Sequence, residues 1–142
     1  MLYIEKIATS LGGKSLLKCS ITSGNDLVNL VQHGLPIDSA VHVLKKGVLT
    51  KSEFYRFISP SRTFERRKKE KKLSADESDK LTRFLRIRAF ASEVFGDEHE
   101  ADLWLREPNL VFQRKPIDLL DTDSGSQLVE NILGRIAHGI PS

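Results

Sequence analysis

Hydrophobic residues in this chain recur mostly at intervals of three and four positions, which is the spacing of amphipathic helices. Three short segments with this pattern lie in the first half of the chain. The first ends at Gly34, the second lies between Asp38 and Gly47, and the third begins at Thr50, which can form a capping box with Glu53. We therefore predict three short helices here.

A serine–proline pair predicts the start of a fourth helix. Ser59 is a candidate N-cap, and Pro60 suits the first helical position because its missing N–H has no partner there. Phe64 faces one side of this helix and basic residues face the other. A supporting helix over residues 50–58 followed by a basic helix over residues 60–71 is the order of a helix-turn-helix unit. Any small helical bundle shares this spacing, so the basic face carries the argument.

The second half of the chain predicts a long helix and then a smaller helical region. Ser74 and Glu77 form a second capping box, and helical spacing continues to Gly96, which gives a helix about 30 Å long. Further helices are expected over residues 98–106, at one short turn after Pro116, and after the loop that ends at Gly125, up to His138 and Gly139.

These elements predict an all-α fold in which a long helix joins an N-terminal DNA-binding unit to a small helical C-terminal domain. Residues 1–24 have only a weak hydrophobic pattern, so we interpret them as an N-terminal arm. The expected parts are the arm (1–24), the helix-turn-helix-like domain (25–73), and the connecting helix with the C-terminal domain (74–142).

The charge of the chain is unevenly distributed. Its 142 residues are 39% hydrophobic and 29% charged, which is ordinary for a folded soluble domain, and the net charge is only +3. Residues 62–72 are densely basic, whereas acidic side chains gather after residue 96. This asymmetry indicates one region for a polyanion and another for a different partner.

Catalysis, metal binding and membrane insertion are not expected. The histidines have no metal-ligand spacing, and the single cysteine, Cys19, excludes an internal disulfide or a cysteine-rich zinc site. The Gly12-Gly13-Lys14-Ser15 run lacks the first glycine of a phosphate loop. There is neither a signal-peptide pattern nor an apolar segment of about 20 residues, so we expect a cytoplasmic protein without a cofactor.

The basic helix supplies DNA-binding candidates of two kinds. Candidates for base edges or nearby phosphates lie near its start: Arg62, Thr63 and Arg66. Candidates for phosphate contacts, which position a protein without reading sequence, are Arg67, Lys68, Lys69 and Lys72. Some of these residues are alternatively only solvated, and Thr63 is alternatively only a cap. RNA binding is disfavoured because no stacking aromatics are interleaved.

Several separated motifs resemble, in the same order, those of one protein family, the Xre/MbcA/ParS-type antitoxins. The resemblance covers residues 61–139 and is strongest to Xre-like antitoxins that are paired with RES-domain toxins. The residues that carry it are Arg62-Thr63-Phe64-Glu65-Arg66-Arg67, Leu73-Ser74, Glu77-Ser78, Ala101, Trp104-Leu105, Pro108-Asn109, Pro116-Ile117-Asp118-Leu119-Leu120-Asp121-Thr122, Gly125, Val129 and Gly139.

This resemblance implies a bacterial type II antitoxin. Such a protein is an all-α homodimer that neutralises a cognate RES-domain toxin, an NAD-consuming enzyme, and represses its own operon by binding operator DNA. It needs no cofactor of its own. The chain departs from the family where residues 110–115 replace the usual glycine-rich turn. The alternative is a stand-alone dimeric helix-turn-helix transcription regulator with no toxin partner.

Candidate toxin-binding residues lie in the C-terminal region. Trp104 is a candidate interface anchor, because aromatic hot spots are common, although a core role is the alternative. The end of the chain is expected to reach into a toxin cleft as a short, stiff tail, with a frayed terminus as the alternative. This tail consists of Ile140, Pro141 and Ser142, and the adjoining residues His138 and Gly139 are further toxin-binding candidates.

Overall fold

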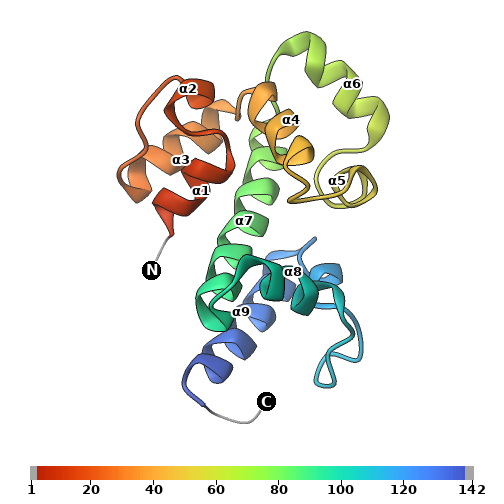
Figure 1. Cartoon of the computed structure of the whole chain (residues 1–142). Helices are drawn as coiled ribbons and strands as arrows, with labels where there is room; N and C mark the ends of the chain where they lie inside the picture. Colours follow the sequence, from red (N-terminus) through yellow and green to blue (C-terminus); the bar gives the residue numbers. More distant parts are fainter. Residues whose placement is uncertain (1–2, 140–142) are drawn as a thin grey trace. The chain divides into compact units, whose positions relative to one another are not determined.

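The computed structural model describes residues 3–139, which form helices and connecting loops without a β-strand, so the all-α prediction is confirmed (Figure 1). The chain divides into two compact units, one up to Thr82 and one from Arg83 onward, and the division falls inside the longest helix, α7 (Ala75–Phe95).

The elements are α1 (Ile4–Ser10), α2 (Gly13–Leu17), α3 (Gly24–His33), α4 (Ile37–Lys45), α5 (Lys51–Phe57), α6 (Ser61–Glu70), α7 (Ala75–Phe95), α8 (Glu98–Arg106), the 3-10 helix η1 (Pro116–Leu119) and α9 (Asp123–Ala137).

Capping residues define the helix-turn-helix region of the N-terminal unit. The Thr50 hydroxyl accepts from the N–H of Glu53 at 3.1 Å, and the Glu53 carboxylate accepts from the N–H of Thr50 at 3.0 Å, so the predicted capping box is confirmed. Phe54 on α5 and Phe64 on α6 are fully buried, and their ring centroids lie 4.8 Å apart in an edge-on arrangement. This aromatic pair holds α6 against α5 and leaves the other side of α6 exposed.

The region that we interpreted as an arm contains two helices. α1 and α2 are short, yet they bury Ile7, Leu11 and Leu17, and α2 contacts both α1 and α4. The seven-residue helix α1 spans just under two turns, and the five-residue helix α2 spans little more than one. Segments this short contain too little of the hydrophobic repeat for periodicity to identify them as helices. The hydrophobic pattern therefore missed this part of the unit.

The start of α6 differs from the prediction. The helix begins at Ser61, Pro60 occupies the N-cap position, and among the described residues no side chain caps the first turn. Ser59 is fully buried, and its hydroxyl donates to the Glu77 carboxylate at 2.7 Å. The prediction that Ser59 is the N-cap is therefore wrong, because the tight α5–α6 turn directs this hydroxyl toward α7.

Glu77 on the first turn of α7 connects three elements. Its carboxylate accepts from the Ser59 hydroxyl, from Arg67 Nε on α6 at 2.7 Å and from the Ser74 N–H at 2.8 Å. The last of these contacts and the Glu77 N–H to Ser74 hydroxyl bond form the predicted capping box. Burial alone raises the pKa of Glu77, but these hydrogen bonds outweigh it and hold the pKa below its ordinary value.

The C-terminal unit is built from the second part of α7 with α8, η1 and α9. Leu105, Val129 and Leu133 are completely buried in it. Gly125, near the start of α9, approaches the Leu119 carbonyl so closely that a Cβ would clash with that oxygen. Ion pairs between α7 and the other helices complete the unit: Arg88 Nε to Asp102 at 2.8 Å and Arg86 to Glu130 at 2.6 Å.

Removing the Glu77 carboxylate is expected to destabilise the N-terminal unit. Glu77→Ala leaves the Arg67 guanidinium and the Ser59 hydroxyl without their shared acceptor, and should lower the free energy of unfolding by about 3 kcal/mol. Urea denaturation of the full chain measures this loss. The matched control is Glu65→Ala, which breaks an exposed ion pair with Lys68 and should cost no more than about 0.5 kcal/mol. Equal effects would contradict the assigned role.

Stability should also depend on pH through this carboxylate. Because the folded state lowers the pKa of Glu77, its ionisation stabilises the fold at pH values above the unfolded pKa of about 4.3, and this contribution is lost as the pH falls through the folded pKa. The difference in free energy of unfolding between wild type and Glu77→Gln should therefore be largest above about pH 5 and shrink below about pH 4. If the difference in free energy of unfolding between the two proteins stayed constant from about pH 4 to about pH 5 and above, ionised Glu77 would not be the source of the pH dependence.

Candidate functional site

The outer face of α6 is basic and exposed. Arg62 and Lys69 are exposed and have no acidic partner among residues 3–139, and the Arg66 side chain, 62% exposed, makes only a long 3.7 Å ion pair with Glu70. Thr63 is half-buried beside them. Since buried Phe64 anchors the opposite side of the helix, this face presents positive charge to solvent, as a helix that enters a DNA groove requires.

Two of the predicted phosphate contacts are already engaged within the unit. The Arg67 side chain is only 18% exposed and binds both Glu70 and Glu77, and these hydrogen bonds raise its pKa. Lys68 lies 3.0 Å from Glu65 and 5.2 Å from the centroid of the Phe64 ring, although its side chain is still 46% exposed. We therefore assign Arg67 to positioning α6 and leave Lys68 as a weaker phosphate candidate.

The last DNA candidate and the toxin candidates are separated along the chain. Lys72 is exposed just after α6, where its backbone forms a bridge with Pro36.

In the C-terminal unit, Trp104 is half-buried, with its ring centroid 5.6 Å from that of Phe95. His138 and Gly139 are exposed at the end of α9, and residues 140–142 of the expected tail lie outside the described part of the chain.

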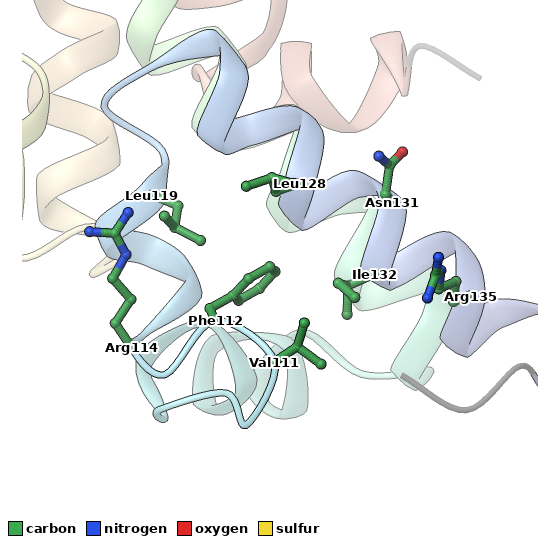
Figure 2. Close-up of a pocket in the computed structure, with 8 residues that line it drawn as sticks. All are labelled: Val111, Phe112, Arg114, Leu119, Leu128, Asn131, Ile132 and Arg135. Atoms are coloured by element: carbon green, nitrogen blue, oxygen red, sulfur yellow. The ribbon is translucent and has the colours of Figure 1, made fainter.

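The C-terminal unit carries a groove that sequence reasoning did not identify. It lies between α9 and the loop that joins α8 to η1, residues 107–115, and its volume is about 430 Å³. Figure 2 shows the Phe112 side chain between this loop and α9, with Arg114 and Arg135 at opposite ends. We call it the loop–α9 groove. Its lining residues are Val111, Phe112, Arg114, Leu119, Leu128, Asn131, Ile132 and Arg135.

The loop that forms one wall of this groove is ordered by its own hydrogen bonds. The Asn109 side-chain oxygen accepts from the N–H of Val111 at 2.8 Å, and its carbonyl accepts from the N–H of Gln113 at 2.7 Å. Asn109 and Arg114 also form a backbone bridge. Leu110, at the tip of the loop, is 97% exposed and therefore contributes almost nothing to the core.

The groove combines apolar lining with unpaired positive charge. Arg114 and Arg135 are exposed, and neither has an acidic partner in the described part of the chain. The sequence did show that residues 110–115 depart from a glycine-rich turn. It could not show that this loop faces Leu128 and Ile132 of α9 across a groove, because that arrangement depends on the tertiary structure.

A basic helix-turn-helix unit followed by a separate helical unit with an exposed apolar groove defines a DNA-binding regulator with a protein-binding domain. Residues 26–86 match the Antitoxin Xre-like helix-turn-helix domain, and residues 90–139 match the Antitoxin Xre/MbcA/ParS C-terminal toxin-binding domain. The chain belongs to the Xre family of type II antitoxins, as the resemblance of its motifs predicted.

Three relatives support the same assignment, each named Antitoxin Xre. The protein from Photorhabdus laumondii is 34% identical over 125 residues, which cover 85% of this chain and 84% of the relative. The protein from Pseudomonas putida is 34% identical over 121 residues, 84% of this chain and 76% of the relative. The protein from Yersinia enterocolitica is 30% identical over 121 residues, 82% of each chain.

The family assignment makes this chain an antitoxin rather than an enzyme, with a helix-turn-helix DNA-binding domain and a toxin-binding domain. The toxin-binding match argues against the alternative of a stand-alone transcription regulator. No helix within residues 3–139 is both long and apolar enough to cross a bilayer.

The two kinds of arginine on α6 should respond differently to substitution. The double variant Arg62→Ala/Arg66→Ala should change the free energy of unfolding by less than about 0.5 kcal/mol, yet weaken binding to duplex DNA at least tenfold. Arg67→Ala should instead lower Tm, because it leaves Glu77 buried without its cationic partner. Calorimetry and fluorescence anisotropy with DNA from upstream of the operon measure the two effects. Unchanged DNA binding in the double variant would exclude this face as the reading surface.

Proposed function

We propose that the chain neutralises a RES-domain toxin, which consumes NAD, and represses its own operon as a homodimer in the bacterial cytoplasm. The observation that carries this proposal is the match of residues 90–139 to a toxin-binding domain in a chain that also has a DNA-binding domain. The RES class is supported by the resemblance of the motifs to Xre-like antitoxins that are paired with such toxins, and the three relatives share the name Antitoxin Xre.

For operator binding, we assign base-edge contacts to the start of α6 and phosphate contacts to its later part. Arg62, Thr63 and Arg66 are the proposed reading residues, with Lys68, Lys69 and Lys72 on phosphates. The support is that all of them except the half-buried Thr63 are exposed, either on α6 or, for Lys72, just after it, and that the buried side of this helix is held by Phe64. A homodimer would place two such helices on two half-sites of an operator.

For toxin binding, we propose two surfaces of the C-terminal unit. The first is the end of the chain from His138 to Ser142, with Trp104 as a further candidate anchor. The second is the loop–α9 groove, whose apolar lining and two unpaired arginines suit a segment of the toxin that presents an apolar side chain flanked by carboxylates.

Co-expression with the product of the adjacent gene tests the antitoxin function. The full chain should restore growth and co-purify with that protein, while a chain lacking residues 139–142 should do both less well if the tail enters the toxin. Rescue by both chains would retain the antitoxin and discard the tail. Absence of both rescue and co-purification with the full chain would overturn the toxin part of the proposal.

The groove is tested in the same assay by charge reversal. Arg135→Glu should weaken co-purification at least tenfold, because an acidic toxin segment would meet a like charge. The matched control is Lys115→Glu, which makes the same change in net charge at an exposed position in the same unit that does not line the groove. Equal effects of the two variants would show general electrostatics rather than docking in the groove.

A further inference from the structure

The N-terminal unit contains a second concentration of positive charge, away from the exposed face of α6. Residues that follow α2 and α6 meet the start of α4 around an open cavity of about 610 Å³, which we call the lysine cavity. Four lysines and one carboxylate line it, among Leu16, Lys18, Gly34, Pro36, Ile37, Asp38, Lys68, Lys71 and Lys72. Even with Lys68 paired to Glu65, three lysines face one carboxylate, so the cavity favours an anion.

Two of these lysines have a backbone conformation that lysine rarely adopts. Lys18 caps α2 with φ 60°, and Lys71 caps α6 with φ 68°. This left-handed conformation at a helix C-terminus normally selects glycine or asparagine, because a Cβ is sterically unfavourable there. Both strained lysines therefore line the same cavity.

The helix dipole does not explain these two positions. A cation near a helix C-terminus is favourable, but the last turn of α6 already contains Arg67, Lys68 and Lys69. The five-residue helix α2 has only a small dipole to offset. Lysine at the strained positions therefore indicates a requirement for charge in the cavity itself, since strain of this kind is typically found at functional sites.

The cavity lies at the end of α6 opposite to Arg62 and Thr63. Arg62 and Lys71 are nine residues apart, or about 14 Å along the axis of α6. The major groove is about 12 Å wide. A helix that places its first turn on base edges therefore brings its other end close to a phosphate strand that borders the groove, where Lys71, Lys72 and Lys18 are exposed.

We propose that the lysine cavity binds backbone phosphates of duplex DNA, and that the N-terminal helices take part in operator binding through Lys18. This inference rests on the DNA-binding function of the helix-turn-helix domain and extends it to residues that precede the domain match, which begins at residue 26. The contact is to the phosphodiester backbone, so it adds affinity without sequence preference.

Substitutions of Lys18 and Lys71 together separate charge from backbone strain. Lys18→Gln/Lys71→Gln (the Gln variant) and Lys18→Arg/Lys71→Arg (the Arg variant) keep the strain and differ in charge. Lys18→Gly/Lys71→Gly (the Gly variant) removes both the strain and the charge. Binding is measured by anisotropy over a salt series, with duplex DNA from upstream of the operon and with a mixed-sequence duplex. Controls are Lys6→Gln, which removes a charge on α1 outside the cavity, and Gln113→Gly, which relieves a left-handed residue (φ 58°) in the other unit.

The Gln variant should lose about tenfold or more in affinity for both duplexes, and the slope of log K against log salt should become shallower by about two. The Arg variant should bind like wild type. The Gly variant should lose binding like the Gln variant while its Tm stays the same or rises by a few degrees, as in Gln113→Gly. Lys6→Gln should leave binding unchanged.

Three outcomes would overturn the proposal. Wild-type affinity and salt slope in the Gln variant would remove the lysine cavity from DNA binding while leaving the function of α6 intact. Unchanged duplex binding in the Gln variant, together with loss of the inorganic phosphate binding that calorimetry measures for the wild-type chain, would show a site for a small phosphate ligand instead. A wild-type chain that binds neither duplex would overturn DNA binding itself, which is a separate result.

Discussion

The hydrogen bonds to the Glu77 carboxylate determine how the basic helix is presented. This group joins the α5–α6 turn, the inner side of α6 and the first turn of α7 through Ser59, Arg67 and Ser74. A buried carboxylate is tolerated only when donors replace its hydration, and here a guanidinium, a hydroxyl and a backbone N–H do so. Arg67 points inward to this carboxylate, whereas Arg62 and Arg66 lie on the exposed face of α6 because of their positions around the helix.

Local patterns predicted most of the fold because they arise from neighbouring residues. The Thr50 and Ser74 capping boxes, the burial of Phe64 and the helix over residues 98–106 all follow from spacing and capping chemistry alone. The site was less predictable. Arg67 appeared equivalent to its basic neighbours, and only the position of Glu77 ten residues later distinguishes it.

Tertiary contacts account for what the sequence pattern missed. The Ser59 hydroxyl was predicted to cap a helix, but the fold of the α5–α6 turn gives it a buried contact with Glu77 instead. α1 and α2 are stable only because Ile7, Leu11 and Leu17 are covered by the rest of their unit. The loop–α9 groove likewise depends on the return of the loop after Asn109, which no periodicity encodes.

The exposed tip of that loop has a consequence for the evolution of these systems. Leu110 contributes almost nothing to the core, and the loop is ordered mainly by the backbone and by Asn109. Substitutions at the tip are therefore nearly free of a stability cost, whereas the helices that bear the groove are constrained by packing. Because the groove beside this loop is one of the proposed toxin-binding surfaces, such freedom would let two duplicated copies diverge at the loop until each bound a different toxin.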